Sequence, residues 1–153
     1  MKEQRRGRKI AMTPEEVDAY LREQRTARVA TVSADGGPHV SALWYVWDGT
    51  AIWLNSIVKS QRWVNVVRDA RVSLLVDGGA EFMELHGVEL LGKAEVVGEV
   101  PRGSDPDPAV AEAERLFGDK YVGGTFVSDG RHAWLRVVPE KIVSWDFRKL
   151  LAG

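Results

Sequence analysis

Residues 53–76 read WLNSIVKSQRWVNVVRDARVSLLV and pass from a strand-like run, through a helix-like run, to a second strand. The helix-like run opens with SQR, and the junction carries two cations, Lys59 and Arg62. The first turn of a helix has unpaired N–H groups and the positive end of the helix dipole, so acidic residues are usual there. Two cations and a serine hydroxyl beside those N–H groups suit a bound phosphate instead. The alternative is that the cations point into solvent or pair with Asp48 or Asp69, and the residues alone leave both interpretations open.

The composition is that of one ordinary globular domain. The chain has 153 residues, 44% of them apolar, and its net charge of −1 comes from 21 basic and 22 acidic residues. This balance predicts neither a nucleic-acid nor a membrane partner, and no apolar run approaches the ~18 residues of a transmembrane helix. The lack of cysteine excludes disulfides, thiol catalysis and cysteine–metal sites. We expect a cytoplasmic protein.

The N-terminal segment, MKEQRRGRKIAM, is basic and lacks the apolar stretch of a secretory signal. We predict that residues 1–12 form a basic, flexible tail; a basic arm for polyanions is the alternative, weakened by the shortness of the run. The TPEE sequence at Thr13 then combines a capping residue, a proline at the first helical position and a glutamate three residues after the cap. We expect a single domain over residues 13–150.

Hydrophobic periodicity and turn residues predict the remaining elements. Strands linked mostly by short turns, with helices between only two strand pairs, predict an antiparallel barrel with helices around it and argue against a parallel sheet. The fold class is therefore mainly β (α+β). The expected elements are a helix to residue 25, strands at 27–33, 39–47 and 50–56 with a hairpin turn at Asp48-Gly49, a helix at 60–68, a strand at 71–76, one long bent strand or two strands in series at 82–100 with bulges at Gly87 and Gly92, a loop at 101–108, a helix at 108–121, and strands at 132–138 and 141–147 separated at Pro139.

Familiar catalytic motifs are missing from the sequence. It has no Gly-x-Ser-x-Gly elbow, no Walker sequence and no Gly-x-Gly-x-x-Gly turn, and its histidines, His39, His86 and His132, are scattered. His86 lies near two glutamates, but without a second histidine nearby a structural role is expected and no metal site is predicted. No catalytic residue can be named from these residues.

Tryptophan is abundant, with six in the chain. Most are expected to pack in the core or at an interface between subunits, and the functional alternative is that at least one flanks a flat ring in a cleft. Five of them lie on or beside predicted strands: Trp44, Trp47, Trp53, Trp63 and Trp145.

Residues 27–78 resemble the pyridoxamine 5′-phosphate oxidase-like split β-barrel superfamily. Within it they look like the small actinobacterial flavin/deazaflavin oxidoreductases of group B, which often use coenzyme F420. The resemblance rests on VATV-x-ADG-x-PHVS, the Asp-Gly hairpin, a strand ending in Asn-Ser, a basic helix start, and N-x-x-RD-x-RVSLLV. PEKIVSWDFRKL at residues 139–150 resembles the closing strand of this group. The implied fold is a six-stranded antiparallel split β-barrel with flanking helices, of the FMN-binding type.

The resemblance implies a homodimer with two cofactor sites in clefts at the subunit interface. A partner would also cover apolar strand faces such as Leu43/Tyr45 and Leu85. Carried over by position, the family's cofactor contacts fall in five places. The phosphate contacts are Ser60, Gln61 and Arg62, with Lys59 as an addition, and the contacts along the ring and ribityl chain are Ser56, Ile57 and Val58. The strand against the ring carries His39, Val40, Ser41 and Trp44, and a neighbouring strand ends at Val76 and Asp77. Trp145 of the other subunit would close the cleft.

The implied function is an F420-dependent oxidoreductase that transfers a hydride to or from a small conjugated or unsaturated organic substrate. Because the cofactor carries the hydride, few side chains are required for chemistry. The chain is shorter than true pyridoxamine-phosphate oxidases, and SQR at residues 60–62 replaces the arginine-lysine pair usual in FMN-binding members, which favours F420. The alternatives are an FMN-binding oxidoreductase, a cofactor-binding module without turnover, and a haem-handling protein with His39 as ligand.

Overall fold

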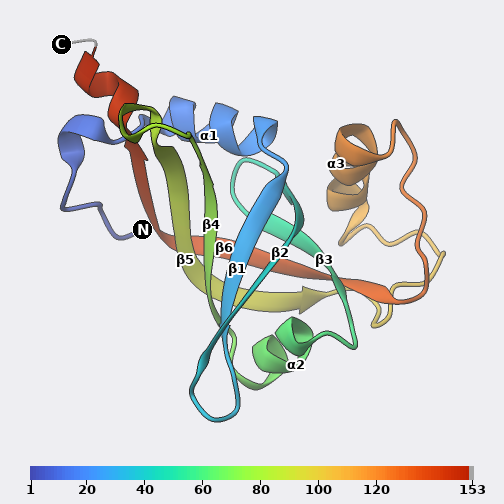
Figure 1. Cartoon of the computed structure of the whole chain (residues 1–153). Helices are drawn as coiled ribbons and strands as arrows, with labels where there is room; N and C mark the ends of the chain where they lie inside the picture. Colours follow the sequence, from blue (N-terminus) through green and yellow to red (C-terminus); the bar gives the residue numbers. More distant parts are fainter. Residues whose placement is uncertain (152–153) are drawn as a thin grey trace.

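The computed structural model describes residues 1–151 and shows a closed six-stranded barrel with neighbours in the order β1-β2-β3-β6-β5-β4 (Figure 1). Every neighbouring pair is antiparallel. The predicted fold class, a split-barrel type with flanking helices, is confirmed. The elements are η1 (Arg8–Ile10), α1 (Pro14–Glu23), β1 (Thr26–Val32), β2 (Pro38–Trp47), β3 (Ile52–Ile57), α2 (Gln61–Arg68), β4 (Arg71–Gly78), η2 (Phe82–Glu84), β5 (His86–Val97), α3 (Ala111–Tyr121), β6 (His132–Asp146) and η3 (Phe147–Leu151).

Two helices close the two ends of the barrel (Figure 1). At one end α1 begins with the capping box predicted at Thr13, whose hydroxyl accepts from the Glu16 N–H. Its inner face, with Leu21 fully buried, joins the alternate apolar residues of the strands in the main core. At the other end α2 inserts Trp63 and Val66 into the same core. Burial of these apolar faces is the main force that holds both helices on the barrel.

The third helix, α3, packs on the outside of the barrel. It covers a second apolar cluster in which Val110 and Ala113 meet Trp53 of β3 and Trp134 of β6. The two indole rings pack edge to face at 6.4 Å between centroids. The sequence prediction that most tryptophans are core residues therefore holds for this pair, which faces outward from the barrel and is covered by α3.

The barrel is split between β2 and β3. The two strands pair at three positions, from Tyr45 with Leu54 to Trp47 with Ile52. Beyond these pairs β2 continues beside β1 as far as Pro38, and β3 continues beside β6 as far as Ile57. The two strands thus part towards the end where α2 lies, which gives this helix access to both.

Several predicted boundaries are wrong. The break at Pro139 does not occur, because β6 is one strand in which Pro139 pairs with Gly92 and Lys141 with Leu91, leaving one extra residue between them. A bulge of this kind accommodates proline, which has no N–H to donate. The bulge predicted at Gly92 is thereby confirmed, whereas Gly87 pairs regularly with Trp145. The predicted strand at 82–100 is shorter, because residues 82–84 form η2.

Other predicted positions also shift. The Asp48-Gly49 turn is a longer loop in which the Asp48 carboxylate accepts from the Thr50 and Ala51 N–H groups. Tyr45, expected on a face that a partner covers, is wholly buried in its own barrel because odd-numbered residues of β2 face inward, and Leu43 packs on the same core. The helices predicted to span 13–25 and 108–121 cover Pro14–Glu23 and Ala111–Tyr121.

The basic N-terminal segment lies along β6. The Lys2 N–H donates to the Glu140 carbonyl at 2.8 Å, and the Gln4 amide exchanges hydrogen bonds with the Ser144 backbone. The mobility predicted for residues 1–12 stays a prediction. Within residues 1–151, none of the helices is both long and apolar enough to cross a membrane.

Gly118 tests how tightly α3 and the chain after it are packed. A Cβ at this position would lie 2.0 Å from the Gly124 carbonyl oxygen, which is backbone and cannot move aside easily. We expect Gly118→Ala to lower the free energy of unfolding by about 1–3 kcal/mol, although alanine is the better helix former by about 1 kcal/mol. Urea denaturation measures this. The exposed neighbour Asp119→Ala is the control, with an expected change below about 0.5 kcal/mol; equal effects would contradict the packing argument.

Candidate functional site

The predicted site lies where β2 and β3 part, and Arg62 of α2 crosses the gap. Its Nε donates to the Ser56 hydroxyl of β3 at 3.0 Å, and its Nη1 donates to the Ser41 hydroxyl of β2 at 2.8 Å. The residue is only 8% exposed. The structure thus brings together three residues that the resemblance assigned to the cofactor.

Arg62 is a buried cation with neutral partners. Among residues 1–151, the ion pairs of the structure do not include it, and both of its hydrogen-bond acceptors are hydroxyls. Burial lowers the pKa of the guanidinium, because desolvation disfavours its charged form. A buried charge is costly unless an opposite charge or a full set of hydrogen bonds offsets it. The arrangement therefore favours binding of an anion at the gap.

Of the other residues at the start of α2, one side chain is free to bind a ligand and two already form hydrogen bonds within the protein. Lys59 is exposed and free to reach a ligand. The Ser60 hydroxyl caps the helix by accepting from the Trp63 N–H at 3.1 Å and donates to the Ile57 carbonyl at 2.7 Å. The Gln61 amide donates to Asn65. The Trp63 N–H is used by the Ser60 cap, whereas the Gln61 and Arg62 N–H groups have no acceptor within the helix and remain usable by a phosphate.

The aspartates considered as alternative partners of the two cations are occupied elsewhere. The Asp48 carboxylate accepts from the Trp53 indole at 2.8 Å in addition to its loop N–H groups. Asp69 forms an ion pair with Arg71 at 2.6 Å, and this pair holds the pKa of the Asp69 carboxyl at about 2. The alternative in which either aspartate neutralises Lys59 or Arg62 is therefore wrong.

Strand alternation divides the predicted site residues between two faces. His39, Ser41 and Ser56 face the barrel interior, where the two serines position Arg62. The outer face beside the gap is apolar and open: Val40 is 67% exposed, Trp44 44% and Ile57 41%. The inner residues can act on a ligand through Arg62, and the outer residues can contact its ring directly.

The last residues of β4 and β6 lie near α1, at the opposite end of the barrel from α2 (Figure 1), and three predicted residues belong to these strand ends. Val76 is in the core, and Asp77 forms an ion pair with Arg28 at 2.6 Å. Asp77 pairs with Gly87, and a Cβ at Gly87 would meet the Trp145 ring at 2.6 Å. Within one chain, Val76, Asp77 and Trp145 therefore do not line the gap between β2 and β3. The expected role of Trp145 through a second subunit stays a prediction.

The sequence interpretation missed a cleft on the outer side of β3. It has a volume of roughly 430 Å³ and lies between β3, α3 and residues 122–131. Trp44 lines this cleft and also lies on the outer face beside the gap. Polar groups in it include Asn55 and the pair formed by His132 Nδ1 and Asp129 Oδ2 at 2.7 Å. In the sequence, the one local sign of this cleft was the spacing of Asp129 and His132, three residues apart in Asp-Gly-Arg-His.

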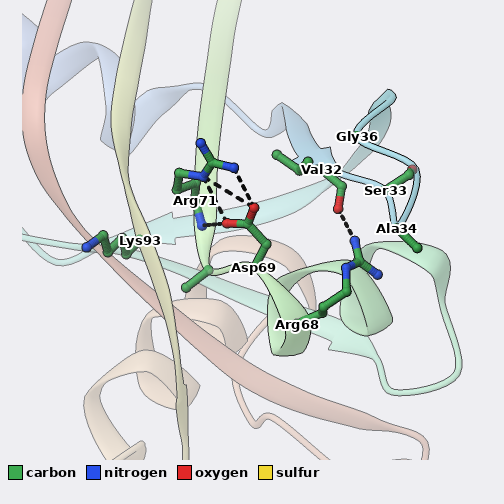
Figure 2. Close-up of a pocket in the computed structure, with 9 residues that line it drawn as sticks. Val32, Ser33, Ala34, Gly36, Arg68, Asp69, Arg71 and Lys93 are labelled. Carbon is green, nitrogen blue, oxygen red and sulfur yellow. Dashed lines mark hydrogen bonds and ion pairs between the residues drawn. The ribbon is translucent and has the colours of Figure 1, made fainter.

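A larger hollow, of roughly 660 Å³, lies at the C-terminal end of α2 (Figure 2). Figure 2 shows that its arginines already have partners: Arg71 binds the Asp69 carboxylate, and Arg68 donates to the Val32 carbonyl. Among the charged side chains drawn there, Lys93 alone has no dashed line to another residue shown. The hollow is at the far end of the helix from Ser60 and was not part of the predicted site. Within residues 1–151, no cluster of three or more potential metal ligands occurs.

A family model for pyridoxamine 5′-phosphate oxidase matches residues 13–146, and the chain belongs to this family. A solved structure of the conserved hypothetical protein Rv2991 from Mycobacterium tuberculosis is 32% identical, with a TM-score of 0.78 and coverage of 98% of this chain and 92% of that one. A structure described as an F420 reductase is 25% identical, with a TM-score of 0.60 and coverage of 82% and 94%.

The haem storage protein HutZ from Vibrio cholerae is 17% identical, with a TM-score of 0.67 and coverage of 85% of this chain and 93% of that one, and this likeness shows the fold alone. The search among curated proteins gave no match.

The buried charge predicts a phosphate-dependent stability. Inorganic phosphate at ten times its dissociation constant should raise the free energy of unfolding by about 1.4 kcal/mol. Phosphate also stabilises proteins in general, as a salt excluded from their surface. Arg62→Met, which keeps an apolar stem of similar length, should show only this general stabilisation and lose the part that comes from binding. Thermal unfolding in phosphate and in chloride at equal ionic strength measures both. An equal phosphate increment in the two proteins would show that Arg62 does not bind the anion.

Proposed function

We propose that the chain is an F420-dependent oxidoreductase that transfers a hydride to or from a small conjugated or unsaturated organic molecule. The observation that carries this proposal is Arg62, a buried cation without an anion, at a gap flanked by exposed apolar side chains. A phosphorylated cofactor with a flat ring matches both properties. The likeness to an F420 reductase at 25% identity supports the choice of F420.

The chain's own residues would bind and orient this cofactor. Arg62 and Lys59, with the first N–H groups of α2, would hold the phosphate, and Val40 and Trp44 would lie against the ring. Ile57 would contribute its side chain, since its carbonyl accepts from the Ser60 N–H and hydroxyl. The deazaflavin would give or accept the hydride, so the protein needs only to position ring and substrate.

Two neighbouring functions share this chemistry. FMN also combines a phosphate with a flat ring, and a cofactor-binding module without turnover would need the same contacts. Haem binding fits less well, because His39 faces inward beside the Arg62 layer and not the outer apolar strip. F420 is preferred because SQR stands at residues 60–62 in place of the arginine-lysine pair.

We also propose that two copies pair through the outer face of the sheet formed by β1, β4, β5 and β6. Diagonally neighbouring outward positions there are Ala30, Leu75, Leu91 and Val143, all half-buried within one chain, with Ser73 and Glu89 between them. An apolar patch of this kind needs a cover, and a self-complementary twofold contact supplies one. Ala30 pairs with Val40 across β1 and β2, so such pairing would bring the partner beside the outer strip at Val40.

The pairing predicts that a charge on this face separates the subunits. Leu91→Glu should convert a dimer to a monomer, because a carboxylate would be desolvated at the contact. Sedimentation velocity measures the state, with Val127→Glu on a distant exposed site as the matched control. A monomeric parent protein, or a dimer that tolerates Leu91→Glu, would reject this interface.

The cofactor proposal is tested by equilibrium binding of F420 and, separately, FMN to the purified protein. Arg62→Met should weaken F420 binding by about 1.5–3 kcal/mol, the range for hydrogen bonds to a charged group, or about ten- to a hundredfold in Kd. Lys59→Ala, on the surface, should weaken it less. Tighter binding of FMN than of F420 would identify the FMN branch, and binding of neither would reject the cofactor proposal. Reduction of an enone by reduced cofactor would separate an enzyme from a binding module.

A further inference from the structure

The cleft beside α3 has the properties of a second ligand site. We propose that it binds a flat, uncharged aromatic molecule that carries a hydroxyl group. Binding of such a molecule does not depend on the cofactor. Its assignment as the substrate does rest on the proposed function, because it follows from the position of the cleft next to the proposed cofactor strip at Trp44.

The walls of the cleft are aromatic. The Trp44 ring stacks on Tyr121 with 4.4 Å between centroids and 8° between planes. Phe117 and Phe126 form a perpendicular pair at 5.6 Å. A volume of roughly 430 Å³ lies within the range of small-molecule pockets. These surfaces favour a flat ring, which can stack on the walls without displacing polar groups.

Asn55 supplies an unused hydrogen-bonding group in this apolar surface. It lies on the outward face of β3, and its Oδ1 is buried without a partner in residues 1–151. A buried acceptor without a donor costs about 1–3 kcal/mol. A ligand hydroxyl would satisfy the side-chain amide in either orientation, because a hydroxyl both donates and accepts.

His132 provides a second polar point on the same face. In the register of β3 and β6, Asn55 pairs with Trp134 and Ile57 with His132, so Asn55 and His132 are diagonal neighbours, about 7–8 Å apart. Asp129 Oδ2 holds His132 Nδ1 at 2.7 Å, while the Arg131 N–H binds Asp129 Oδ1 at 2.8 Å. The Arg131 N–H and the imidazole lower the pKa of the Asp129 carboxyl to about 2, so the carboxylate stays charged and orients the ring. The Nε2 atom is left for a ligand.

The cleft does not offer a free cation. Arg102 lines it, but its guanidinium binds Glu99 at 2.8 Å and Glu114 at 2.9 Å, and the pair with Glu114 is largely buried. Arg102 also contributes its carbonyl to the Ser128 hydroxyl. An anionic ligand would therefore meet a neutralised arginine and the negative Asp129. A neutral hydroxyl-bearing ring fits this electrostatic environment.

Calorimetric titration of the protein without cofactor tests the proposal with 2-naphthol and 2-methoxynaphthalene, which have similar shape but differ in the hydroxyl donor. We expect 2-naphthol to bind at least tenfold more tightly. Asn55→Leu should remove this difference, since it replaces the amide by an apolar group of similar volume. Lys59→Ala, at the proposed phosphate site, is the control and should leave naphthol binding unchanged.

The outcomes distinguish this site from the cofactor site. Equal affinity for the two probes, or no binding of either, would overturn the proposal, and so would a preference that survives in Asn55→Leu. The comparison of probes in the parent protein needs no variant, so a poorly folded Asn55→Leu would not decide the result. Naphthol binding without F420 binding would leave the cleft established and reject only the cofactor. A loss of naphthol binding in Lys59→Ala would place the probe at the gap instead and overturn the proposal.

Discussion

The side chain of Arg62 bridges the split of the barrel and adds polar contacts to the apolar burial that holds α2 in place. Once β2 and β3 have parted, its guanidinium joins Ser41 to Ser56 and replaces the missing contacts between the strands. A planar group with several donors can span two acceptors, which a lysine cannot do in the same geometry. One turn later Asn65 donates to Thr31 of β1 at 3.0 Å. The helix is thus fixed to three strands by polar contacts on either side of its apolar centre.

The same contacts explain why consecutive residues of a matched strand have different roles. Successive side chains of a strand point to opposite faces, so a motif carried over as a continuous run mixes ligand-facing residues with their supports. Ser41 belongs to the supports because it holds Arg62, whereas Val40 and Trp44 are exposed beside the gap. A substitution at Ser41 would change the site through the position of the guanidinium and not through direct contact with a ring.

Local signals predicted most of the fold. The capping box at Thr13 and the alternating strands identified the order of elements, since both depend on neighbours in sequence. The continuity of β6 through Pro139 could not be predicted, because it depends on the bulge opposite Gly92 in another strand. The same limit applies to Asn55: nothing in the sequence around it says that its outward face meets α3 and residues 122–131. The cation pair at Lys59 and Arg62 was predictable, but the burial of Arg62 was not.

The gap and the cleft differ in charge, and this difference follows from the partners of two buried arginines. Arg62 has hydroxyl partners, so its positive charge is available to a ligand. Arg102 is bound by two glutamates, so its charge is neutralised within the fold. Trp44 lies where the gap and the cleft meet, and its ring stacks on Tyr121. An anionic group is therefore favoured on one side of this fixed wall and a neutral ring on the other. Under the proposed function the two ligands would meet past the edge of Trp44 and not across its ring, because reacting atoms must approach to about 3–3.5 Å.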